Sequence, residues 1–111
     1  MWKLPEESVL LRIFIGESDK YKNKPLYEQI VLKARELNLA GATVLRGIMG
    51  FGADSRMHSA KLLNLSMDLP IVIEIVDTKE NIDKILPFID DNLIEGMVTL
   101  ENIKVIKYRH S

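Results

Sequence analysis

Residues 70–93, PIVIEIVDTKENIDKILPFIDDNL, decide the fold because they place a strand and a helix in direct succession. The first eight residues form an apolar run typical of a strand, and a proline is tolerated at a strand's first position. Asp77 or Thr78 then predicts a helix cap. The side chains that follow recur at helical spacing; they are Ile82, Ile85, Leu86, Ile89 and Leu93. Pro87 predicts a bend or break in this helix, and Gly96 predicts its end.

A second strand-and-helix pair lies earlier in the chain. Residues 8–16, SVLLRIFIG, are apolar on both faces, which predicts a strand inside a sheet. One face holds Val9, Leu11, Ile13 and Ile15, and the other holds Leu10, Arg12 and Phe14. Arg12 is the exception, and its face is expected to meet water or another subunit. Pro25 predicts a helix start, and Gly41 or Asn38 predicts its end. The apolar stripe of this helix is Leu26, Ile30, Val31, Ala34 and Leu37.

Two more strands complete the pattern. They are residues 42–49, ATVLRGIM, and residues 98–108, VTLENIKVIKY, the latter with an irregularity expected near Asn102. Residues 53–69 form a long connection between the second and third strands, and connections of this length are typically functional or mobile. Within it, residues 58–65 would also fit a short helix.

The order of elements predicts a fold class. Strand, helix, strand, strand, helix, strand is the βαββαβ order of an α+β, ferredoxin-like fold. In that fold a four-stranded antiparallel sheet carries two helices on one face. The other face is left bare, and oligomerisation is the simplest way to cover it if it is apolar.

The composition narrows the class of protein. The chain has 111 residues, which fits a single domain spanning residues 1–111. A formal net charge of −1 gives no bulk attraction for nucleic acid. The absence of cysteine excludes disulfides, thiolate metal sites and cysteine catalysis. No apolar run is long enough to span a bilayer and no secretory signal is evident, so we expect a cytoplasmic protein without direct membrane insertion.

The stretch GIMGFGADSR, residues 47–56, concentrates Gly47, Gly50 and Gly52. Glycines allow backbone N–H groups to converge on a phosphate. The spacing matches neither the Walker motif nor the dinucleotide-binding motif, so a bent or bulged strand end is the plainer interpretation. Three basic residues flank the cluster, and they would either neutralise a phosphate or lie in solvated loop; they are Arg46, Arg56 and Lys61.

Catalytic and metal-binding patterns are weak. His58 and His110 are the only histidines, and two histidines with scattered carboxylates do not make a metal signature. No serine lies in a nucleophile elbow, and no histidine–carboxylate pair has a recognisable catalytic spacing. Asp90 and Asp91 are expected on a solvated helix surface, and the charged residues of 16–25 in a wet loop. We therefore predict a binding protein rather than an enzyme, with no metal and no required cofactor.

Three blocks of sequence carry a family resemblance. They are GESDKYKNKPLYEQIV (16–31), GATVLRGIMGFGADSRMHSAKLLNLSMDLPIVIEIVDT (41–78) and EGMVTLENIKVIKY (95–108). These blocks resemble the PII-like family of small prokaryotic proteins of unknown function, over about residues 8–108. The resemblance implies a fold related to the nitrogen-regulatory PII proteins and to the copper-tolerance protein CutA, both of which form trimers. PII proteins bind adenine nucleotides between subunits, and their long loop changes shape with the ligand and contacts a target protein.

The resemblance also implies a ligand site by position. Residues 47–50 match the segment whose backbone lies along the nucleotide in PII proteins, and residues 96–98 match their phosphate-binding loop. The chain departs from PII there, because IEGMVT replaces a glycine-rich loop containing Asp-Gly-Lys. This departure favours a mono- or diphosphate, or another nucleotide, over a triphosphate. Phe51 would pack the loop or stack on a base. The predicted nucleotide-binding residues are Arg46, Gly47, Met49, Gly50, Phe51, Gly52, Arg56, Lys61, Gly96, Met97 and Val98.

Three functional hypotheses follow. The first is a homotrimeric PII-like signalling protein that binds AMP, ADP or ATP at subunit interfaces and signals to an unknown target protein through residues 51–68. The second is a CutA-like metal or small-ion tolerance protein without nucleotide binding, which the lack of cysteine and scarcity of histidine disfavour. The third is a small nucleotide hydrolase, for which no acid–base pair is evident.

Overall fold

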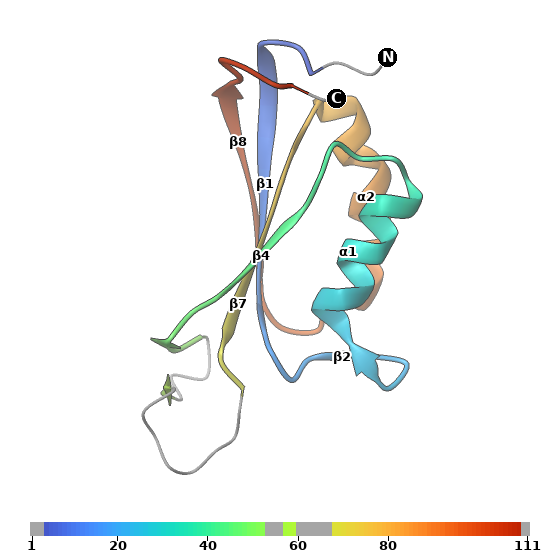
Figure 1. The fold of residues 1–111 in the computed structure, drawn as a ribbon. Helices are drawn as coiled ribbons and strands as arrows, with labels where there is room; N and C mark the ends of the chain where they lie inside the picture. Colours follow the sequence, from blue (N-terminus) through green and yellow to red (C-terminus); the bar gives the residue numbers. More distant parts are fainter. Residues whose placement is uncertain (1–3, 53–56, 60–67, 110–111) are drawn as a thin grey trace.

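A computed structural model of the protein describes residues 4–52, 57–59 and 68–109. Its main sheet has four antiparallel strands in the order β4-β7-β1-β8, and both helices lie on one face of that sheet (Figure 1). The strands are β1 (Glu7–Gly16), β4 (Thr43–Arg46), β7 (Pro70–Asp77) and β8 (Met97–Lys104), and the helices are α1 (Leu26–Glu36) and α2 (Lys79–Asn92). The α+β, ferredoxin-like prediction is confirmed.

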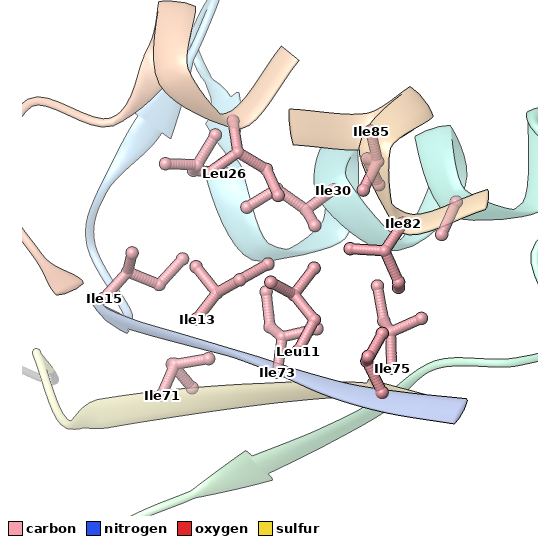
Figure 2. Packing of buried hydrophobic residues seen from close by; sticks show 13 residues of the cluster. Leu11, Ile13, Ile15, Leu26, Ile30, Ile71, Ile73, Ile75, Ile82 and Ile85 are labelled. Atoms are coloured by element: carbon pink, nitrogen blue, oxygen red, sulfur yellow. The ribbon is translucent and has the colours of Figure 1, made fainter. Parts of the chain in front are cut away.

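Strand β1 lies inside the sheet, as its two apolar faces predict. It pairs with β7 on one side and with β8 on the other, in both cases residue for residue. Its alternate side chains from Val9 to Ile15 are buried beneath the helices. Figure 2 shows the labelled side chains of β1 beside the isoleucines of β7, with the apolar side chains of the two helices packed over them. Full burial of each such side chain stabilises the fold by about 1.5–3 kcal/mol.

Helix α1 ends at Glu36, and Asn38 just beyond it makes the terminating turn instead of Gly41. Asn38 has φ +61°, the left-handed conformation. Its N–H donates to the carbonyl of Arg35 at 3.1 Å, and the N–H of Leu39 donates to the carbonyl of Ala34 at 3.0 Å. This is the Schellman pattern of a helix C-terminus. The alternative end at Gly41 is therefore wrong.

Helix α2 begins as predicted and ends earlier than predicted. Thr78 caps it, with its side-chain oxygen accepting from the N–H of Asn81 at 3.1 Å. The helix runs through Pro87 without dividing, so a break there is wrong. It ends at Asn92, because Leu93 already has extended backbone. Gly96 therefore does not end the helix; it directly precedes β8 instead.

The second predicted strand is divided in the structure. β4 stops at Arg46, and a separate two-stranded ladder joins β5 (Met49–Gly50) to β6 (His58–Ser59). Because His58–Ser59 pairs as a strand, a helix beginning at residue 58 is wrong; residues 60–65 lie outside the described residues. A second short hairpin, β2 (Lys20–Tyr21) with β3 (Lys24–Pro25), precedes α1. β8 pairs with β1 without interruption, so the irregularity expected at Asn102 is also wrong.

The sheet face opposite the helices carries an apolar row. Directly paired residues of an antiparallel sheet point to the same face. Register therefore aligns four apolar side chains across all four strands near one end; they are Leu45, Val72, Phe14 and Met97. None of them is fully buried, and none of the described helices covers them.

Charges occupy the middle of this open face. Arg12 lies directly across from Glu74, and its Nε donates to Glu74 Oε2 at 2.9 Å. Its Nη1 also donates to Glu101 Oε1 at 3.3 Å. The hydrogen bond from Arg12 to Glu74 raises the pKa of Arg12 above its ordinary value. The arginine that the sequence marked as an exception is thus paired within its own sheet.

Candidate functional site

One end of the sheet gathers the segments that the sequence singled out. β1 and β4 end there, while β7 and β8 begin there, as the antiparallel order requires (Figure 1). The segments at this end are residues 16–19, 46–52, 57–59, 68–70 and 96–98. The predicted long loop leaves from β4 and returns to β7 at the same end, so we call residues 46–52 together with residues 68–70 the loop root.

Two of the three clustered glycines pack against one proline. A Cβ atom on Gly47 would lie 3.2 Å from Pro70 Cγ, and one on Gly50 would lie 2.9 Å from the same atom. The N–H of Gly47 donates to the carbonyl of Pro70 at 2.7 Å. Close packing on a rigid ring therefore accounts for both glycines, and the Gly47 amide is already bonded to protein. Gly52 has nothing within 4 Å of its would-be Cβ and is free of this constraint.

An ion pair spans the loop root. Arg46 Nη2 lies 2.6 Å from Glu17 Oε2, although Arg46 ends β4, Glu17 follows β1, and β7 lies between these two strands. The Glu17 side chain is only 15% exposed, whereas that of Arg46 is 55% exposed. Glu17 Oε1 is buried and has no hydrogen-bond partner among the described residues. One of the three cations predicted to neutralise phosphate, Arg46, is thus paired with a largely buried carboxylate of the same chain.

The turn after β1 is tied to the returning end of the loop. The N–H of Glu17 donates to the carbonyl of Leu69 at 2.9 Å, and the N–H of Ser18 donates to Asp68 Oδ1 at 2.8 Å. Asp19 Oδ2 also accepts from the N–H of Gly16 at 3.1 Å. Residues 16–19, expected in a wet loop, therefore make hydrogen bonds within the chain, and sequence reasoning did not select Glu17 for the candidate site. A lone acidic residue among mixed charges gives no pattern that identifies it.

The second predicted segment lies at the same end of the sheet but at the opposite edge. Gly96 has φ +143°, and a Cβ there would lie 2.4 Å from the carbonyl oxygen of Phe14. Met97 and Leu45 share one row across the sheet, with two strands between them. Three strand spacings put these edges about 14 Å apart. Within one chain, residues 96–98 therefore do not meet residues 46–52.

Apolar side chains are exposed around the loop root. Phe51 is 68% exposed, and its backbone lies outside any helix or strand. Ile48 and Met49 beside it are exposed as well, as is Met57 before β6. Phe51 contacts no aromatic ring among the described residues, and its role in loop packing or base stacking stays a prediction.

Some predicted residues lie outside the described ranges. Arg56 and Lys61 are among them, as is most of the predicted signalling loop, and so are His110 and the side chain of His58. Among the described residues, no group of three histidine, cysteine or carboxylate side chains could hold a metal ion. Neither α1 nor α2 is long and apolar enough to cross a bilayer.

A hollow lies at the other end of the sheet. It encloses about 680 Å³ between the last turns of α1, the following connection and the residues after β8. Its lining is mainly apolar, with Arg35 and Tyr108 as the larger polar contributors. Among the described residues, none of those predicted to bind nucleotide lines this hollow.

Comparison with known proteins identifies the family. Residues 8–105 match DUF190, a family described as "Uncharacterized ACR". A UPF0166 protein of Aquifex aeolicus is 40% identical over 97 residues, which cover 87% of this chain and 91% of that protein. A UPF0166 protein of Methanocaldococcus jannaschii is 36% identical over 78 residues, covering 70% of this chain and 71% of that protein.

Solved structures share the fold. CPII, a nitrogen regulatory PII-like protein from Thiomonas intermedia K12, was solved bound to ADP, AMP and bicarbonate. It superposes with a TM-score of 0.65 at 20% identity, over 91% of this chain and 90% of that chain. A proposed PII-like signalling protein from Thermus thermophilus gives a TM-score of 0.66 at 16% identity, over 90% of both chains. The resemblance stated from sequence is confirmed at the level of family and fold.

Proposed function

This chain belongs to the DUF190 family, and from its sheet geometry we propose that it is a PII-like regulatory protein that binds an adenine nucleotide between the subunits of a homotrimer. The ligand would be AMP, ADP or ATP, and CPII, which shares the fold, is bound to ADP and AMP. The role proposed is binding and signalling in the cytoplasm, without catalysis.

The observation that carries the proposal is the placement of the two candidate segments. Residues 46–52 and residues 96–98 lie at one end of the sheet but at opposite edges. In a ring of subunits whose sheets form the sides of a prism, the β4 edge of one subunit adjoins the β8 edge of the next. The two segments would then complete one site between neighbouring subunits, which neither edge offers alone.

The open sheet face supports the ring. Its apolar row would be covered by the neighbouring sheets, while the charges around Arg12 are paired within each subunit and need no partner from outside. Burial of an already paired cation costs less than burial of a free one. The proposed interface is thus apolar at one end of the sheet, and in its middle the charge of Arg12 is balanced by carboxylates of the same subunit.

Signalling would follow from a population shift. A nucleotide that contacts the loop root binds one arrangement of residues 51–68 better than another, and a target protein reads the difference. Arg46 is the described cation nearest to the start of this loop and would contact the phosphate. ADP, with two phosphates, suits a site in which IEGMVT replaces the phosphate-binding loop containing Asp-Gly-Lys of the PII proteins.

Calorimetry with the full chain tests nucleotide binding. Titration with AMP, ADP and ATP is expected to show saturable binding, with about one nucleotide for each subunit. Guanosine diphosphate serves as the control for recognition of the base. If none of the three adenine nucleotides binds at millimolar concentration, the nucleotide function is wrong.

A further inference from the structure

We propose that Glu17 is an internal competitor for the phosphate of the ligand: its carboxylate holds Arg46 in the ligand-free protein, and a bound phosphate displaces it. This inference rests on the nucleotide function proposed above.

Exposure decides which partner a ligand can reach. Arg46 Nη2 and Glu17 Oε2 are 2.6 Å apart, but the arginine side chain is largely exposed and the glutamate side chain largely buried. A phosphate arriving from solvent therefore meets the guanidinium first. Phosphate oxygens accept paired hydrogen bonds from guanidinium as carboxylate oxygens do, and ADP carries more negative charge than one carboxylate. The two anions thus compete for the same donor.

The buried position of the Glu17 carboxylate depends on its pairing with Arg46. One carboxylate oxygen, Oε1, is buried and accepts no hydrogen bond from the described residues. The other oxygen is held by Arg46. A buried carboxylate without a partner is strongly unfavourable. When a phosphate takes the guanidinium, Glu17 must therefore leave its buried position for water.

Movement of Glu17 would affect residues 68 and 69, where the loop returns to β7. Its own N–H is bonded to the carbonyl of Leu69, and the next residue's N–H is bonded to Asp68. Its side chain is bonded to Arg46, at the start of the loop. Glu17 thus joins the departing and the returning ends of the loop root. Displacement of its side chain would loosen both ends together and couple anion binding to the loop.

The test compares ADP with adenosine, which has the same base and sugar but no phosphate. Glu17→Gln keeps the size of the side chain and removes the competing charge. It is expected to tighten ADP binding about tenfold while leaving adenosine binding unchanged. Glu6→Gln is the matched control, because Glu6 forms an exposed 3.8 Å pair with Lys104 at the opposite end of the sheet. It should leave both affinities as they are.

A double-mutant cycle isolates the pair. The gain from Glu17→Gln should vanish in an Arg46→Gln background, since no guanidinium is left to release. Weaker or unchanged ADP binding by Glu17→Gln would overturn the proposal, because it would mean that Glu17 orients Arg46 or does not act on it. If Glu17→Gln folds poorly, Glu17→Asp retains the charge but shortens its reach, and tighter ADP binding is again expected.

Hydrogen exchange without nucleotide separates this proposal from the nucleotide function. In Glu17→Gln, the amides of Gly47 and of residue 17 should exchange faster, because they donate to the carbonyls of Pro70 and Leu69 and so hold the loop root together. We call the Glu17–Arg46 ion pair, which is proposed to hold these two hydrogen bonds in place, the internal latch. Unchanged exchange at both amides would overturn the internal latch. Faster exchange in a protein that binds no adenine nucleotide would retain the latch and reject the nucleotide.

Discussion

A methyl group on Gly96 would lie 2.4 Å from the backbone carbonyl oxygen of Phe14. The residue just before β8 and the site end of β1 are therefore packed backbone against backbone. Gly96 also holds φ at +143°, where residues with a Cβ atom are strained.

Gly96→Ala is expected to destabilise the protein by about 2–4 kcal/mol, because backbone strain adds to a contact that no side chain can relieve. The control is Gly41→Ala, since nothing lies within 4 Å of a Cβ there. Urea unfolding followed by circular dichroism measures both. Equal stability of the two variants would contradict the close packing at Gly96.

Gly50→Ala is expected to disturb the loop root without unfolding the protein. Its Cβ would lie 2.9 Å from Pro70 Cγ, and the proline ring cannot rotate away. Overpacking of this kind costs about 1–3 kcal/mol. Gly52→Ala, two residues along, meets nothing within 4 Å and should have little effect. Thermal unfolding of both variants checks the difference, and a larger loss at Gly52 would contradict the packing on Pro70.

Asp77→Asn is expected to lower stability by about 1–3 kcal/mol through a buried hydrogen-bond network. Asp77 is fully buried and accepts from the N–H groups of Ala40 and Thr78 and from the side chain of Asn81. An amide nitrogen in place of one oxygen would face a donor. Denaturant titration measures the loss, with Asp83→Asn on the exposed face of α2 as the control. A wild-type midpoint for Asp77→Asn would contradict this role.

Val72→Glu tests the open sheet face. Val72 lies between Phe14 and Leu45 in the apolar row, so a carboxylate there would be buried without a partner in the proposed ring. We expect dissociation to monomers in analytical ultracentrifugation. Leu32→Glu places the same charge on an exposed position of α1 and should leave the assembly intact. Intact assembly of Val72→Glu would exclude this face as the interface.

The ion pair of Arg12 is expected to contribute the same stability at every pH between 6 and 9. Its pKa is raised in the folded protein, chiefly by the hydrogen bond to Glu74. A raised pKa adds stability that is present below the unfolded value and is lost only as the pH rises through the folded value, which for an arginine lies far above pH 9. Loss of stability in that range that Arg12→Gln abolishes would contradict the assignment.

The elements were predictable where apolar periodicity was strong. The two-faced run around Arg12 predicted an internal strand, and the stripe from Ile82 to Leu93 predicted α2. Both follow from local spacing alone. Helix ends were less predictable, because Asn38 and Gly41 both suit a C-terminus, and backbone hydrogen bonds decide between them.

The site was predictable only in outline. Sequence placed the glycine cluster at the root of the loop, but the packing of Gly47 and Gly50 depends on Pro70, which β-sheet pairing brings beside them. The role of Glu17 depends on Arg46 in the same way, since a non-adjacent strand supplies it. Local patterns carry no information on such contacts.

Native mass spectrometry with ADP reports assembly and ligand together, and so decides whether the nucleotide site lies between subunits. We expect a mass of three chains that gains up to three ADP molecules as the nucleotide is added, with no ADP on the monomer. ADP bound equally well to isolated monomers, or a trimer that takes up no ADP at millimolar concentration, would contradict a nucleotide site between subunits.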